Sequence, residues 1–92
     1  MSLVVTTELG TVTVPDAVIA GIAVRAAEGV DGVRVRRRGV ELAAEAVRLT
    51  VEVARGEPLP ALAGRAQDEV AATLRAMCGI ETRVDIAIAE LA

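Results

Sequence analysis

One pattern occurs twice in this chain of 92 residues and limits the folds open to it. An alternating, β-branched segment is followed by a proline, by apolar residues at helical spacing, by a glycine, and by a second alternating segment. The pattern runs over residues 12–35 and again over residues 51–88. Alternation is typical of strands, and apolar residues three and four apart are typical of helices. Each half of the chain is therefore predicted to form a strand–helix–strand unit.

In the first half, we expect a strand at residues 11–14 and a helix at about residues 16–28. Pro15 suits the first turn of a helix, and Gly29 supplies its end. A further strand is expected at residues 33–36, with a turn at Gly39 after which residues 40–42 pair back. The inner face of the helix is expected to carry Ile19, Ile22, Ala23, Ala26 and Val30.

The second half contains the clearest strand, at residues 46–54, where apolar and polar positions alternate. One face of the resulting sheet should be covered and the other polar, as antiparallel sheets permit. A loop at residues 55–60 leads to a helix at about residues 60–78, with Gly79 just past its end. The last strand is expected at residues 84–88. The inner stripe of the second helix is expected to comprise Leu62, Ala66, Val70, Thr73, Leu74 and Met77.

Together these elements predict an α+β fold, a two-layer sandwich with both helices on one face of a mainly antiparallel sheet. A split βαβ, ferredoxin-like arrangement is the natural form of such a fold. We expect residues 1–10 to form a short N-terminal segment and residues 11–92 a single domain. Phe, Tyr and Trp are absent, so the core must consist of small aliphatic side chains. Small domains with thin cores often gain stability by associating.

Several classes of chemistry lack the residues that they require. The chain has no His and a single Cys, Cys78, so no cluster of the usual zinc ligands can form. Asp68 and Glu69 are adjacent on a helix and point about 100° apart, which does not suit acid–base work. We therefore expect no enzyme, no metal, no cofactor and no small-molecule substrate. No signal-peptide pattern and no apolar run of about 20 residues is present, so we expect a cytoplasmic protein.

Several segments, in order, resemble a known family. Residues 10–33 read GTVTVPDAVIAGIAVRAAEGVDGV, with an Asp-x-Val-Ile-x-x-Ile-Ala helix start and an Ala-Ala-x-x-Val-x-Gly-Val helix end. Later come Val51-Glu-Val-Ala-Arg-Gly56, Gln67 with Val70, Met77-Cys-Gly-Ile80 and Val84-Asp-Ile-Ala-Ile88. In order and spacing these segments resemble the alkaline-shock (general-stress) protein family of the bacterial cell-envelope stress response. The resemblance implies a non-enzymatic protein that self-associates and is held near the inner face of the membrane by a separate anchor protein.

Two other motifs have a functional and a structural interpretation. Arg34, Arg36 and Arg38 would share one face of a strand and could bind an anion, but charged residues also protect sheet edges, and we favour that role. The net charge of −3 and the missing aromatics do not favour a nucleic-acid partner. Gly29-Val-Asp-Gly32 fits the G-x-x-G loop of RNA-binding KH domains, yet a helix end and a turn explain it better.

The outward face of the first helix is unusual because it is almost uncharged. It should carry Ala17, Ala20, Gly21 and Val24, where solvent-facing helices are normally polar. Either a contact with another chain or a covering N-terminal segment at residues 3–5 would explain this. The leading hypothesis is a self-associating, partner-binding scaffold, and the alternative is a nucleic-acid-binding module that uses the arginine cluster.

Overall fold

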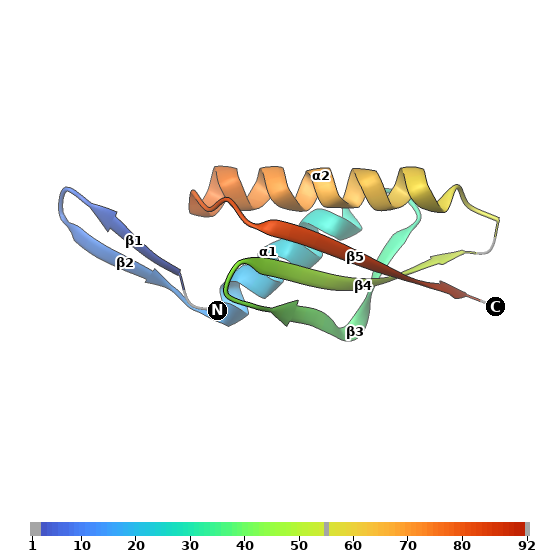
Figure 1. Ribbon diagram of the computed structural model, residues 1–92, viewed down its shortest axis with the longest axis horizontal. Helices are drawn as coiled ribbons and strands as arrows, with labels where there is room; N and C mark the ends of the chain where they lie inside the picture. Colours follow the sequence, from blue (N-terminus) through green and yellow to red (C-terminus); the bar gives the residue numbers. More distant parts are fainter. Residues whose placement is uncertain (1–2, 55, 92) are drawn as a thin grey trace.

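Two helices lie on one side of a three-stranded sheet, and a two-stranded hairpin stands apart from both (Figure 1). The computed structural model describes residues 3–54 and 56–91. The predicted α+β class, with its two layers, is confirmed. The elements in chain order are β1 (Leu3–Thr7), β2 (Gly10–Val14), α1 (Asp16–Glu28), β3 (Val33–Leu42), β4 (Ala46–Ala54), α2 (Leu59–Cys78) and β5 (Arg83–Leu91).

The main sheet is mixed and has the order β3-β4-β5. β3 pairs antiparallel with β4, while β5 runs parallel to β4 after the crossover through α2. The strand expected at residues 11–14 lies outside this sheet, because β2 pairs with β1. The first half of the chain therefore supplies no second βαβ unit. Alternation revealed that residues 11–14 form a strand but did not reveal which strand they pair with.

Both helices end at the glycines expected to end them. α1 covers Asp16–Glu28, and the N–H of Gly29 donates to the carbonyl oxygen of Arg25 at 3.1 Å. Gly29 itself is right-handed; Gly32, with φ 87°, is the left-handed residue of the connection to β3. Gly79 ends α2 with φ 69°, a left-handed conformation that glycine adopts without steric cost.

The core lies between β4 and the two helices. The alternation of β4 places its four apolar side chains toward the helices, and each is at most 1% exposed. In α1, Ala26 was expected on the inner face but is only half-buried, and Ala27 is buried instead. Met77 was expected in the core but is 65% exposed, because the last turn of α2 extends past the start of β5 (Figure 1). The buried residues of the two helices are Ile19, Ile22, Ala23, Ala27, Leu62, Ala66, Val70 and Leu74.

β3 does not turn back at Gly39, which corrects the expected hairpin there. The strand continues to Leu42 and pairs with β4 along both of its parts. Val35 pairs with Val51 and Val40 pairs with Leu49, so four residues of β3 stand opposite the single residue Thr50. Such a bulge interrupts alternation without reversing the chain.

The β1–β2 hairpin gives the molecule its elongated shape. The Cα radius of gyration is 13.8 Å, against about 12 Å for a compact domain of this length, and the longest dimension is 50 Å. Figure 1 shows the hairpin extending from the N-terminal end of α1, away from the body. Val14 at its base packs against the core. Residues 3–5, considered above as a cover for the first helix, instead pair with β2.

Over the described residues, neither helix combines the length and apolar character that crossing a membrane would require.

Candidate interaction surfaces

The outward face of α1 agrees in phase with the sequence prediction. Ala17 is exposed, while Ala20, Gly21 and Val24 are half-buried. A methyl group added at Gly21 would meet nothing within 4 Å, so this position faces open space and not the core. Val18, which the sequence analysis did not single out, is 47% exposed beside this face. The surface formed by these five residues is called the α1 face below.

An open groove of about 290 Å³ runs between the two helices, next to the α1 face. Val18 lies one helical turn before Ile22, so the α1 face and the groove are continuous. The groove was not predictable from the sequence, because Met77 continues the apolar stripe of the second helix and was expected in the core. The groove is lined by Ile22, Arg25, Ala26, Thr73 and Met77.

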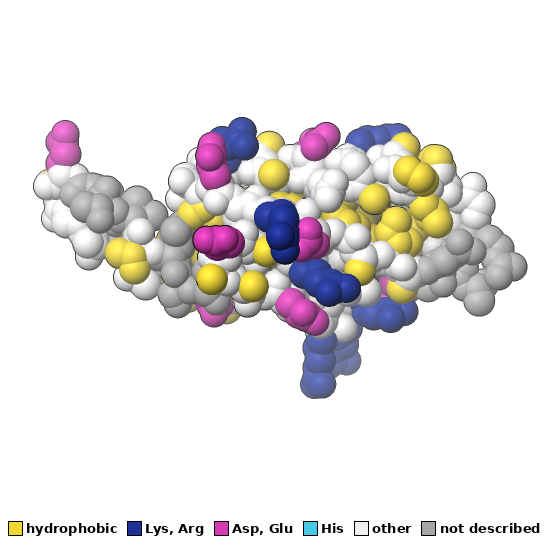
Figure 2. Space-filling view, viewed as in Figure 1, with side chains coloured by type: hydrophobic (Ala, Val, Ile, Leu, Met, Phe, Trp, Pro, Cys, Tyr) yellow, Lys and Arg dark blue, Asp and Glu magenta, His cyan; other side chains and the backbone are white. Residues whose placement is uncertain are grey.

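The arginine cluster lies on the bulge of β3. All four of its side chains, Arg34 and residues 36–38, are exposed. Because alternation breaks after Val35, the cluster is not the regular one-sided row that the sequence predicted. Arg38 has a positive φ of 61°, while Arg36 lies beside Glu52 with a nitrogen–oxygen distance of 3.6 Å. Basic side chains project from the lower edge of the molecule in Figure 2, where β3 bends.

The face of the sheet opposite the helices mixes charges of both signs, as Figure 2 shows. Strand register places Arg48 between Glu41 on β3 and Asp85 on β5, which favours mutual neutralisation. Arg83 contacts Asp85 at 3.2 Å. This face is therefore a solvated surface with balanced charge.

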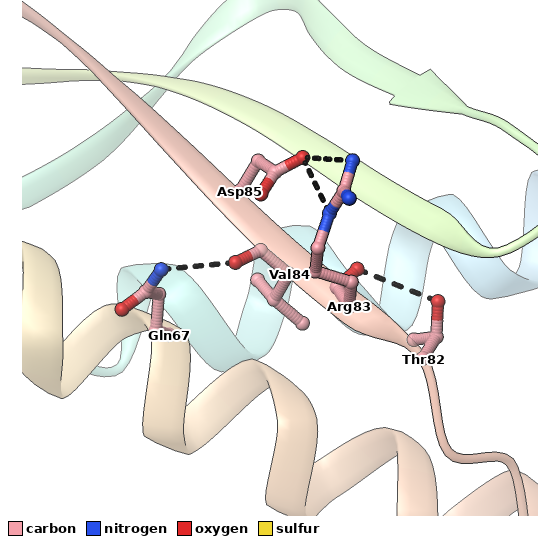
Figure 3. Close-up of polar contacts among 5 residues, drawn as sticks. All are labelled: Gln67, Thr82, Arg83, Val84 and Asp85. Carbon is pink, nitrogen blue, oxygen red and sulfur yellow. Dashed lines mark hydrogen bonds and ion pairs between the residues drawn. The ribbon is translucent and has the colours of Figure 1, made fainter.

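The start of β5 is fastened to α2 by a side chain. Gln67 donates from Nε2 to the carbonyl oxygen of Val84 at 3.0 Å (Figure 3). The N–H of Arg83 donates to the carbonyl oxygen of Glu45, on the β4 side of the strand. Successive residues of a strand direct their backbone groups to opposite sides, so the carbonyl of Val84 points to the outer edge of the sheet. Gln67 thus satisfies the first acceptor of an otherwise open edge. Its role in this structure is to hold the crossover helix on the sheet.

The G-x-x-G segment connects α1 to β3 and has no second helix after it, unlike the loop of a KH domain. A shallow hollow of about 330 Å³ lies beside it, lined by Gly29, Val30, Asp31, Arg65 and Glu69. Two carboxylates border this hollow, and they would repel a phosphate. The structural interpretation of these glycines is therefore the better one.

The remaining chemical candidates do not come together. Asp68 and Glu69 are both exposed on α2, and Cys78 is a half-buried free thiol at its end. Across residues 3–54 and 56–91, no three potential ligands among His, Cys, Asp and Glu are placed to share a metal ion.

Comparison with protein-family models, with curated proteins and with solved structures found no match to this chain. The relation to the alkaline-shock family therefore stays a proposal that depends on the sequence motifs quoted above.

Proposed function

We propose that this protein is a non-enzymatic scaffold that acts by binding itself and partner proteins. The observation that carries the proposal is the α1 face: a helix surface in which Ala17 and Val18 are exposed and Gly21 faces open space, with no charged residue among its five members. Solvent-facing helix surfaces are normally polar, and contiguous exposed apolar surface commonly marks an interaction site.

The resemblance to the alkaline-shock family supports a more specific proposal. The scaffold would act in the cell-envelope stress response, in the cytoplasm, held at the inner face of the membrane by a separate anchor protein. Affinity capture of the tagged protein from its native cell should recover an integral membrane protein. The Gly21→Arg variant described below should recover less of it if the α1 face also binds the anchor. Capture of soluble proteins alone would contradict the membrane part of this proposal.

We expect the Gly21→Arg substitution to weaken self-association by at least roughly tenfold, because it places an unpaired charge in the contact. The fold should remain intact or gain stability, since glycine costs about 1 kcal/mol in a helix interior and arginine is a good helix former. Sedimentation across a concentration series measures the effect. Interference optics are needed because the chain has no aromatic residues.

A matched control is Ala72→Arg, which adds the same charge to an exposed position on the outer side of α2. It should associate as the wild type does. A wild type that stays monomeric at high concentration would end the proposal, and circular dichroism would reveal a variant that unfolds instead of dissociating.

A second candidate function is nucleic-acid binding through the arginine cluster. The observation that favours it is the bulge, which inserts three exposed arginines, residues 36–38, into the edge of the sheet. The mixed charges elsewhere on this side and the net charge of −3 oppose it.

We expect no sequence-specific binding to duplex DNA at physiological salt. If three arginines each neutralise one phosphate, any residual affinity should fall roughly 40-fold between 50 and 200 mM salt. A gel-shift titration with salt measures this. A salt-resistant, sequence-dependent shift would make Arg34, Arg36 and Arg38 the site and would favour the nucleic-acid function over the scaffold.

A further inference from the structure

The most exposed large apolar side chains among the described residues lie on only two parts of the molecule. Val4 is 58% exposed and Leu9 is fully exposed, and both belong to the hairpin. Met77, 65% exposed, lines the groove between α1 and α2, and Val18, 47% exposed, lies one helical turn before the groove residue Ile22. Two separate apolar surfaces on one chain can each be buried if one covers the other.

Apart from Val14 at its base, the described part of the hairpin has little of the support that a two-stranded ribbon needs. Within the described residues, β1 and β2 pack mainly against each other. An isolated two-stranded hairpin is at best marginally stable in water, and packing against a helix or a third strand is what stabilises it. The hairpin points away from its own groove, since it extends from the N-terminal end of α1 while the body lies on the other side (Figure 1).

The hairpin is long enough to cover the groove. Each hairpin strand has five residues, which span about 16 Å. On α1 the lining of the groove extends from Ile22 to Ala26, a rise of about 6 Å. A hairpin that lies along the groove from its base to its tip would therefore cover the whole groove.

The charges of the two surfaces are complementary as well. Glu8, at the tip, is the only charged residue in the sequence of the hairpin, and among the described residues Arg25 is the only charged one that lines the groove. Within the described part of the chain, neither side chain has an ion-pair partner. A two-fold axis near the base of the hairpin would bring each tip toward the Arg25 end of the other chain's groove.

We propose that the β1–β2 hairpin of one copy docks in the groove between α1 and α2 of a second copy, so that two chains exchange hairpins. This inference rests on the proposed self-association and adds the segment that makes the contact. The dimer is symmetric, because each chain gives one hairpin and receives one. It buries Val4 and Leu9 against Val18 and Met77, with Glu8 opposite Arg25.

Charge reversal tests the proposal. In the full-length chain, Glu8→Arg and Arg25→Glu should each weaken self-association roughly tenfold, because the symmetric dimer contains the disrupted pair twice. An equimolar mixture of the two variants should regain wild-type association. In the mixed dimer each hairpin again faces a groove of opposite charge. Sedimentation with interference optics measures all of these samples.

Glu57→Arg and Arg65→Glu are the matched controls, since they reverse the same charges at exposed positions outside the groove. Control variants and wild type should associate equally. If the wild type dimerises and the Glu8 and Arg25 variants behave like the controls, hairpin exchange is wrong while self-association stands. If both variants dissociate and mixing does not restore the dimer, Glu8 and Arg25 do not meet between chains, which also overturns the proposal. A monomeric wild type would end both proposals.

Discussion

Replacing Leu49 with alanine should destabilise the fold by about 3 kcal/mol, within the range measured for buried leucine-to-alanine changes. Leu49 is fully buried, lies on the central strand and belongs to the core cluster that contains residues of both helices. The chain has no aromatic side chain that could move into the cavity. A domain of this size has a free energy of unfolding near the low end of about 5–15 kcal/mol, so the variant should retain only about 2 kcal/mol. Urea denaturation followed by far-ultraviolet circular dichroism measures the loss.

Leu9→Ala is the matched control, because it deletes the same atoms from a fully exposed side chain. At a protein concentration low enough to favour the monomer, it should change the free energy of unfolding by less than about 0.5 kcal/mol. A Leu49→Ala protein with wild-type stability would show that the core of the described residues does not depend on β4.

The helices and the central strand were the most predictable parts of this fold. Their signals are local: a proline before α1, a glycine after each helix, and strict alternation along β4. The expected bounds of α1 and β4 agree with the structure, and α2 begins one residue before the expected start. Local backbone preferences and burial on one face are sufficient to fix such elements.

Pairing and irregularity were not predictable in the same way. Residues 11–14 alternate like any strand, and nothing in the alternation distinguishes a strand of the main sheet from half of a separate hairpin. The bulge in β3 was not predictable because residues 36 to 38 are all arginines. No apolar position in this segment indicates where the register between β3 and β4 shifts. Gly39 suggested a turn, although the structure uses it for close backbone contact.

The candidate site was predictable only in part. The phase of α1 followed from its apolar spacing, which identified Gly21 as outward-facing, and the structure places open space there. Apolar spacing could not predict the groove, because the groove depends on where the last turn of α2 lies relative to the sheet. Met77 continues the apolar stripe of Val70 and Leu74, yet lies in the turn that extends past β5.

The two sides of the molecule differ in a way that fits a scaffold. The sheet side has mixed charges and an arginine bulge at its edge, features that oppose pairing with other strands. The helix side carries the α1 face and the groove, where uncharged side chains predominate. Association through the helix side would therefore be selective, while the charges of the sheet side would discourage strand-to-strand aggregation.

Replacing Gly39 with alanine should destabilise the fold by about 2–3 kcal/mol, the upper part of the range for overpacking. A methyl group at this position would lie 2.7 Å from the carbonyl oxygen of Arg36 and 2.8 Å from that of Thr50. Both contacts are backbone atoms, so no side-chain rotation relieves them. The bulge must widen or β3 must separate from β4. Either change would also alter how residues 36–38 are presented.

Gly64→Ala is the matched control for this change, since a methyl group at Gly64 in α2 meets nothing within 4 Å. Glycine is unfavourable in a helix interior, so this variant should be more stable than the wild type by about 0.5–1 kcal/mol. The same substitution should thus lower the free energy of unfolding at Gly39 and raise it at Gly64. Urea denaturation of the two variants measures both changes. A Gly39→Ala protein as stable as the wild type would mean that the bulge widens without cost. The arginines would then not be held in a fixed arrangement, and the case for an anion site on β3 would lose its structural basis.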